Sequence, residues 1–426
     1  MKKKVLISLL SIGALMSSAN AEAWLWLDGD KNVNSLPIMS DGTVVNNGDR
    51  ILFCQDWNSI SADVTDGVNK LTLGAISFSG SRGQAGNTDI YIGEGFELIV
   101  SALHTETKGM LADSQVNFMG DGIVTFYDFR AHQTGTATEW NIEAATKFAS
   151  SGGDLYVGAD TTVTFSNLVE SSGSREIKIG ENGKLTINYT GTSWQSFNIN
   201  GLSVDGGTFN FTGDLGKPVM IHGTANSINS LSEDAKVSYL RIAGGCSLEI
   251  GAGIERKVIS SNAGITLEHG AKLTLNSEDV LKTSSKELNA NGCIRVECQG
   301  AAKTAFLELG ANHSFADLRS NNGSTVFTIT LNGNVITFDN IFTDGFSQII
   351  FSDFEDELLR ITNKESIADI DISKLVAMQN GTQLSVNWID RGDYYALTSA
   401  IVPEPAQWAM IFGAVALGFA MYRRRK

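Results

Sequence analysis

Residues 155–165 read LYVGADTTVTF and residues 177–187 read IKIGENGKLTI. In both stretches an alternating strand runs into a glycine-containing turn, and a second alternating strand follows. Alternation of apolar and polar residues places them on opposite faces of a strand, so each strand has one apolar face to bury. The two stretches therefore predict pairs of short β-strands that contribute to one core.

The same pattern recurs along residues 85–340. Residues 90–100 (IYIGEGFELIV) and 116–126 (VNFMGDGIVTF) are close copies, and weaker copies follow to the end of that range. A strand pair cannot bury its apolar face alone, whereas stacked copies bury a continuous core. We therefore expect an all-β fold, a right-handed parallel β-helix (β-solenoid) with about three strands per turn. The alternative is a set of antiparallel β-sandwich domains in which each glycine turn closes a hairpin.

The composition agrees with turn-rich β structure. The chain has 426 residues, of which 44 are Gly and only 4 are Pro, and its formal net charge is −15 at pH 7. Gly supplies the positive φ angles of tight turns, whereas Pro interrupts strand ladders. An acidic surface repels nucleic acid, so nucleic acid is not expected as a partner.

The first 21 residues have the composition of a cleavable secretion signal. Residues 2–4 are all Lys, residues 5–16 are mostly apolar, and residues 19–21 read ANA. A basic start, a short apolar segment and an A-x-A site are the three parts of a signal peptide. We expect a signal peptide over residues 1–21 and export through the inner membrane.

The C-terminus carries the most specific motif of the sequence. A Pro-Glu-Pro triplet precedes an apolar stretch over residues 409–421, and a cluster of Arg follows it. A positive end stays on the cytoplasmic side, so the rest of the chain would lie across the membrane. From Trp408 to Tyr422 a helix would rise only about 22 Å, which suits a transient transmembrane segment better than a durable anchor. The residues of this motif are Pro403, Glu404, Pro405, Arg423, Arg424 and Arg425.

These three parts, in this order, resemble the PEP-CTERM sorting tail. The resemblance covers the last two dozen residues and implies that the chain is the substrate of an exosortase, a membrane-embedded thiol protease or transpeptidase that removes the tail. It implies a final location in the cell envelope, on the outer surface or in the extracellular matrix. The repeated body is also similar to autotransporter passenger regions, a likeness that depends on the strand pattern alone.

These observations divide the chain into five parts. Residues 1–21 form the signal peptide, 22–84 an N-terminal cap with the first turns, 85–345 the β-helix repeats, 346–400 a C-terminal cap, and 401–426 the sorting tail with its transmembrane helix. A solenoid needs caps because an open terminal turn is an exposed strand edge. Within the C-terminal cap, residues 358–372 are the most helix-like stretch of the body.

Neither a catalytic constellation nor a cofactor or metal site is predicted. The five His lie in different repeats without partners at metal or triad spacing, and no serine-hydrolase elbow or phosphate-binding loop occurs. The four Cys leave two interpretations open, a disulfide in an exported chain or buried small hydrophobes. These residues are His104, His132, His222, His269 and His313, and Cys54, Cys246, Cys293 and Cys298.

Three acidic groups are candidate sites. Residues 28–39 resemble a calcium loop but have Val33 and Met39 where Gly and Glu are required, so a polar turn is expected. The acids of residues 353–357 would complement the N-terminus of the helix expected after them. Glu94, Asp121 and Asp160 lie at turns of neighbouring copies, where two interpretations are open: a stack of carboxylates, or ordinary solvated turn residues.

We therefore expect a non-catalytic exported protein that is structural or adhesin-like, with an exosortase, and either exopolysaccharide or host glycan, as partners. The alternative is a β-helical polysaccharide lyase or glycoside hydrolase, which would need converging carboxylates on one face.

Overall fold

The computed structural model describes residues 24–27, 33–36 and 47–399, apart from gaps at 54–56, 65–66, 68, 79–84, 106–108, 132–136, 150–152, 192–195, 214–217, 252–256, 262–263, 284–292, 298–302 and 321–322. These residues belong to two compact units, Met1–Arg241 with Cys246–Ala263 (unit 1) and Ile242–Gly245 with Gly264–Lys426 (unit 2). Both units are built almost wholly of β-strands, and together they contain about 11 turns of a β-solenoid.

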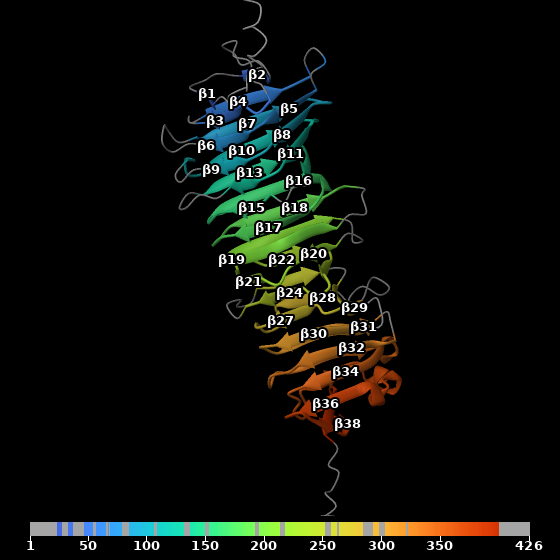
Figure 1. Cartoon of the computed structure of the whole chain (residues 1–426). Helices are drawn as coiled ribbons and strands as arrows, with labels where there is room; N and C mark the ends of the chain where they lie inside the picture. The colour runs from blue at the N-terminus through green and yellow to red at the C-terminus, as the bar shows by residue number, and fades with distance from the viewer. Residues whose placement is uncertain are drawn as a thin grey trace, which may run out of the picture. The chain divides into compact units, whose positions relative to one another are not determined.

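Unit 1 contains three columns of parallel strands, and over residues 70–171 each turn of the solenoid (a rung) adds about one strand to every column (Figure 1). Column A contains β2 (Val33–Leu36), β4 (Trp57–Ala62), β7 (Asn87–Ile92), β10 (Ser114–Met119), β13 (Thr138–Ile142), β16 (Thr161–Ser171), β18 (Lys184–Tyr189), β19 (Phe197–Gly213), β22 (Ala235–Val237) and β25 (Ile259–Ser261). Column B contains β5 (Lys70–Leu73), β8 (Glu97–Val100), β11 (Ile123–Phe126), β14 (Ala145–Phe148) and the second half of β16.

Column C completes each rung, and the long β19 runs through a corner to serve both columns A and C. Column C contains β1 (Trp24–Leu27), β3 (Arg50–Phe53), β6 (Ala75–Phe78), β9 (Leu103–Thr105), β12 (Phe129–Ala131), β15 (Leu155–Val157), β17 (Ser174–Ile179), β21 (Asn226–Leu231) and β24 (Ser247–Ile250). Two further short strands, β20 (Val219–Ile221) and β23 (Leu240–Ile242), pair with each other, and β20 also pairs with the first residues of β19.

The register of the ladder explains how the sequence repeats build the core. Equivalent apolar residues pair directly from one rung to the next, because each rung returns the same position of the repeat to the same place. In column A this gives one continuous inward row: Ile60, Ile90, Phe118, Ile142, Phe165, Ile187 and Phe211. All of these side chains are buried.

Aromatic rings fill much of the core of unit 1. The indole of Trp140 lies edge-on to Phe78 and Phe129, with ring centroids 5.1 and 5.7 Å away. Phe165 contacts both Phe129 and Phe148, at 5.2 and 5.1 Å. Edge-to-face geometry at such distances adds to the stabilisation that burial of the rings provides.

Glycine is required where a corner brings two rungs close together. A Cβ atom on Gly207 would lie 2.5 Å from the carbonyl oxygen of Gly180 and 2.7 Å from that of Gly183. No side chain fits in that space, so the glycine-containing turns of the repeat are a packing requirement as well as a turn signal.

Unit 2 continues the same construction with parallel pairs from β26 to β36. Its elements are β26 (Ile265–Glu268), β27 (Lys272–Leu275), β28 (Leu281–Thr283), β29 (Cys293–Glu297), β30 (Lys303–Leu309), β31 (His313–Ser320), β32 (Thr325–Thr330), β33 (Ile336–Ile341), η1 (Thr343–Gly345), β34 (Phe346–Ser352), β35 (Leu359–Ile361), η2 (Lys364–Asp369), η3 (Ile372–Lys374), β36 (Leu375–Gln379), β37 (Thr382–Leu384), β38 (Val386–Asp390) and β39 (Tyr395–Ser399).

Antiparallel pairing occurs only in the last part of unit 2 among the strand pairs that the structure describes. There β36 pairs with β37, and β39 pairs with both β35 and β38. The prediction of a parallel β-solenoid is confirmed, and the alternative of antiparallel sandwich domains is wrong. A hairpin brings adjacent strands together, whereas here each strand pairs with its counterpart one rung away.

The expected helix over residues 358–372 is wrong. That stretch contains β35, the whole 3₁₀ helix η2 and the first residue of the 3₁₀ helix η3, and the N-caps of the two helices are Asn363 and Asp371. Both cap side chains accept hydrogen bonds from backbone N–H groups two residues ahead, which favours short turns over a continuous helix. Among the described residues, no helix is long and apolar enough to cross a membrane.

Candidate functional site

The predicted sorting residues lie outside the described part of the chain. This applies to Pro403, Glu404, Pro405, Arg423, Arg424 and Arg425, to the signal peptide, and to most of the calcium-loop-like segment. Of the cysteines, Cys246 is half-buried, and its Sγ accepts a hydrogen bond from the Gly223 backbone N–H at 3.2 Å. Cys54 and Cys298 are outside the described residues, as is the side chain of Cys293.

The described histidines have separate environments. His222 Nε2 lies 3.0 Å from Asn198 Oδ1, and His269 Nδ1 accepts a hydrogen bond from the Thr304 backbone N–H. His313 is buried against the ring of Phe315, and burial lowers its pKa from 6.5 to about 4. Within the described residues, no group of three or more His, Cys, Asp and Glu side chains is placed to hold a metal ion.

Glu94, Asp121 and Asp160 do not line up in one stack. Glu94 and Asp121 lie in the turns that follow β7 and β10, whereas Asp160 lies in the turn that precedes β16. The three carboxylates are therefore at opposite ends of the column A strands. The repeat copies look alike at every glycine turn, and only the strand register separates one corner of the solenoid from another.

The acids of residues 353–357 also differ from their expected role. Glu357 pairs with Arg391, and Asp356 Oδ1 accepts a hydrogen bond from the Ser399 backbone N–H. They tie the turn before β35 to the segment that contains β38 and β39, and no helix follows them.

A surface groove of about 300 Å³ lies at the start of three column A strands, β10, β13 and β16. The side chains that line it are polar or acidic apart from one Ala. They are Asp113, Ser114, Ala137, Thr138, Glu139, Asp160 and Thr162. Asp113 and Asp160 have positive φ angles of 60° and 55°, a conformation that Asp tolerates better than most residues.

The outward side of column A continues from this groove, and we call it face A. Its members include the outward residues of five strands: Asn87, Asp89, Tyr91, Gln115, Asn117, Met119, Glu139, Asn141, Thr162, Thr164, Lys184, Thr186 and Asn188. One row runs directly from rung to rung through Asp89, Asn117, Asn141, Thr164 and Thr186.

Part of face A is tied together by amide hydrogen bonds. Asn117 Nδ2 donates to Asp89 Oδ1 at 2.8 Å, and Asn141 Nδ2 donates to Asn117 Oδ1 at 3.2 Å. The hydroxyls of Thr162, Thr164 and Thr186, in contrast, make no hydrogen bond to any residue that the structure describes. They are half-buried and face outward, so their hydrogen-bonding capacity is available to solvent or to a ligand.

The charged groups on the outward side of column B are paired with one another. Lys70 Nζ lies 3.0 Å from Glu97 Oε2, and the Glu97 carboxylate also accepts a hydrogen bond from Thr125 Oγ1 at 2.8 Å. One rung further along the ladder, Lys147 Nζ lies 3.8 Å from Glu170 Oε2.

The outward side of column C is also charge-paired. Arg130 bonds to both Asp128 and Asp154, at 2.9 and 2.7 Å, and its guanidinium lies 4.8 Å from the ring centroid of Tyr156. Lys178 approaches the same ring from the next rung, at 4.7 Å. On each of these two sides the charged groups are therefore paired with other groups of the same side.

Among the described residues of unit 1, Arg175 is a buried cation and is 2% exposed. Its guanidinium donates to the backbone carbonyls of Tyr127, Ala149 and Gly153, at 2.7 to 3.2 Å, and lies over the ring of Phe148. Burial lowers its pKa to about 10, so it remains charged at neutral pH. Arg175 is a structural group that closes a corner of the solenoid, because it satisfies carbonyls that would otherwise be left without partners.

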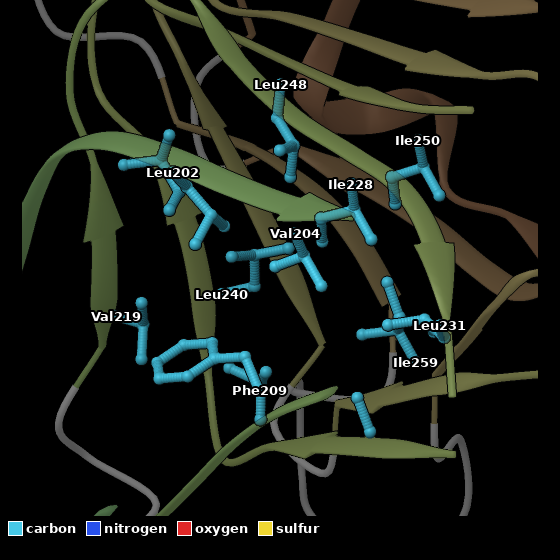
Figure 2. Close-up of a pocket in the computed structure, with 13 residues that line it drawn as sticks. Leu202, Val204, Phe209, Val219, Ile228, Leu231, Leu240, Leu248, Ile250 and Ile259 are labelled. Atoms are coloured by element: carbon cyan, nitrogen blue, oxygen red, sulfur yellow. The ribbon is translucent and has the colours of Figure 1, made fainter. Parts of the chain in front are cut away.

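A small cavity of about 20 Å³ lies in the core between β19 and β25. Figure 2 shows aliphatic side chains, among them Val204, Ile228 and Leu240, together with the ring of Phe209, around it. It is lined only by apolar groups and is the size of a single water molecule, so it holds neither a ligand nor a stable water.

Sequence reasoning did not find the groove. A signal for it exists, since Asp113-Ser114, Ala137-Thr138 and Asp160-Thr161 place a small hydroxyl residue at the start of successive column A strands. These hydroxyl residues are buried, and Thr138 Oγ1 donates to Thr161 Oγ1 at 3.3 Å. Only knowledge of which strands are neighbours turns these pairs into one row.

No protein-family model, curated protein or solved structure matches the chain.

Proposed function

We propose that this protein is an exported, non-catalytic component of the cell envelope or extracellular matrix, structural or adhesin-like, with its C-terminal tail processed by an exosortase. The observation that carries the proposal is the repeated solenoid, whose core is filled by apolar side chains and whose polar surface is regular from rung to rung. Such repeats present long, uniform surfaces, which suit binding to extended polymers. The handedness of the solenoid is expected to be right-handed.

The tail supplies the sorting part of the proposal. Pro403, Glu404 and Pro405 would be recognised by the exosortase, and Arg423, Arg424 and Arg425 would hold the C-terminus on the cytoplasmic side of the membrane. The segment between them would form the transmembrane helix before processing.

The test changes both prolines of the motif in the full chain, Pro403→Ala with Pro405→Ala, in cells that contain an exosortase. We expect an unprocessed precursor in the membrane fraction. Its signal peptide is removed, and it is heavier than the processed protein by the mass of the tail. Pro218→Ala is the matched control, because it removes a proline of the body and should be processed normally. Normal processing of the double variant would refute the exosortase assignment.

A second candidate is a polysaccharide-active enzyme, and the groove favours it because three carboxylates, those of Asp113, Glu139 and Asp160, line one open site. A glycoside hydrolase needs two carboxylates on either side of the scissile bond. Incubation of the purified full chain with polysaccharides, followed by size-exclusion chromatography, separates the two candidates. Shortened chains would support the enzyme, and unchanged chain length would support the non-catalytic protein.

A further inference from the structure

We propose that face A, together with the adjoining groove, binds a neutral polysaccharide. This inference rests on the proposed function, since it names the polymer class and the surface that an adhesin-like solenoid would use. The occupant is defined by its chemistry: a chain rich in hydroxyl groups and without formal charge.

The first argument is the difference between the three outward sides of unit 1. Columns B and C pair their charges internally, as Lys70 does with Glu97 and Arg130 does with Asp128 and Asp154. Face A also contains paired groups, since Gln115 Nε2 donates to Glu139 Oε2 at 2.8 Å and Lys184 pairs with Glu233, but the hydroxyls of its three Thr have no partner among the described residues. A surface whose donors and acceptors are free gains more from a ligand than one whose groups must first be separated.

The second argument is the regular spacing of these groups. Thr164 and Thr186 pair across neighbouring strands, and Thr162 is two residues before Thr164 on the same side of β16. Adjacent strands lie about 4.8 Å apart, and residues two apart along a strand lie about 6.6 Å apart. The flat array of hydroxyls that results repeats on the scale of a sugar ring, which suits a polymer with hydroxyls at regular intervals.

The third argument concerns charge and the groove. Asp113, Glu139 and Asp160 line the groove, and no Lys or Arg does. Carboxylates accept strong hydrogen bonds from sugar hydroxyls, and they repel polyanions, as does the net charge of −15. Anionic polysaccharides are therefore disfavoured on this face.

An exposed aromatic side chain completes face A. Tyr91 is 44% exposed and pairs in register with Met119 of the next rung. A tyrosine ring that faces solvent offers an apolar surface against which the C–H face of a sugar can stack, while its hydroxyl stays hydrated.

The test is affinity electrophoresis of the full-length protein in gels that contain a soluble neutral glycan, namely dextran, mixed-linkage β-glucan or galactomannan. We expect retardation by at least one of these three. We also expect that Thr162→Val, Thr164→Val and Thr186→Val combined weaken binding about tenfold or more, because three hydroxyls are lost at nearly constant shape. Tyr91→Ala should weaken it as well.

Two matched variants control for folding and for position. Replacing the same three Thr by Ser keeps the hydroxyls and should keep binding, and Thr274→Val with Thr328→Val makes the same change on outward positions of unit 2 and should leave binding unchanged. Circular dichroism spectra that match the wild type show that each variant is folded.

Three outcomes would overturn the inference: no retardation by any neutral glycan, equal binding by the Val and Ser triple variants, or stronger retardation by cationic chitosan that salt abolishes. The last outcome would identify simple ion exchange on an acidic surface. If binding fails while the tail is still processed, the inference is wrong and the proposed sorting stands. If processing fails while glycan binding persists, the reverse holds.

Discussion

Between Phe53 and Phe197 the core of unit 1 is packed largely with aromatic rings, whereas between Leu202 and Ile259 it is lined mainly by aliphatic side chains around a small cavity. The backbone construction is the same in both regions. The difference shows that strand pairing sets the cross-section of the solenoid core. The volumes of the inward side chains then decide whether that cross-section is filled. Where rings interlock the space is full, and where branched aliphatic residues replace them a gap remains.

The largest expected effect comes from removing the centre of the aromatic region. Trp140 is fully buried and contacts Phe78 and Phe129. Trp140→Ala should lower the free energy of unfolding by about 3–5 kcal/mol, because the neighbouring strands are held in the ladder and cannot collapse into the space. Urea unfolding followed by circular dichroism measures this. Leu240→Ala in the aliphatic region is the comparison, and a larger loss there would show that the aromatic packing is not the stronger of the two.

The second largest effect is expected in unit 2, where the ionisable ring of His313 is part of a stack of aromatic rings. His313 lies 5.3 Å from the ring of Phe315, which lies 5.8 Å from that of Phe338. Because burial lowers the pKa of His313 to about 4, the unfolded chain binds more protons than the folded chain between pH 4 and 6.5. Neutral His313 therefore makes its full contribution to the free energy of unfolding above pH 6.5. This contribution falls by up to about 3 kcal/mol as the pH decreases toward 4.

Urea unfolding at a series of pH values tests this dependence. His313→Phe should flatten the profile between pH 6.5 and 4, whereas His222→Gln, which changes a less buried histidine, should retain it. A profile that His313→Phe leaves unchanged would assign the pH dependence to other groups.

A third prediction concerns the buried cation beside the aromatic region. Arg175→Met keeps the length and apolar contacts of the side chain but leaves the carbonyls of Tyr127, Ala149 and Gly153 without these donors. We expect a loss of about 2 kcal/mol, from the desolvation cost of unpaired carbonyls. Thermal unfolding of Arg175→Met and Arg175→Lys checks this. Greater stability of the Met variant would mean that desolvation of the guanidinium outweighs its hydrogen bonds.

The smallest effect should be a gain in the aliphatic region. Val204→Ile adds one methylene group toward the cavity shown in Figure 2, which should raise the free energy of unfolding by up to about 1 kcal/mol. The same measurement on Val163→Ile, in the filled region, should show no gain or a loss, since additional volume there requires the packing to shift. Equal gains at both positions would remove the distinction between the two regions.

The fold could be predicted from the sequence because its signal is repeated. The alternation in residues 90–100, 116–126, 155–165 and 177–187 requires stacked strands, and the parallel ladder follows from that requirement. The end of the ladder was harder: residues 358–372 have an apolar spacing suited to a helix, but Asn363 and Asp371 cap short turns instead.

The candidate site could be predicted much less well. The turn of Asp160 resembles those of Glu94 and Asp121 in sequence but lies at a different corner of the solenoid. A difference of one corner places a side chain at the opposite end of a column A strand. Face A consists of common polar residues, Thr and Asn, that carry no motif. Their relation appears only when the register brings Asn141, Thr164 and Thr186 into one row.

The antiparallel strands at the end of unit 2 have a consequence for fibril formation. A parallel ladder that ended at β36 would present a row of free N–H and C=O groups matched to the strands of another molecule, and head-to-tail growth would follow. β37 folds back onto β36 and occupies that row, while β39 does the same for β35. β37 and β39 therefore block the addition of another molecule at this end of the ladder. A protein truncated after Gln379 should polymerise more readily than the intact protein.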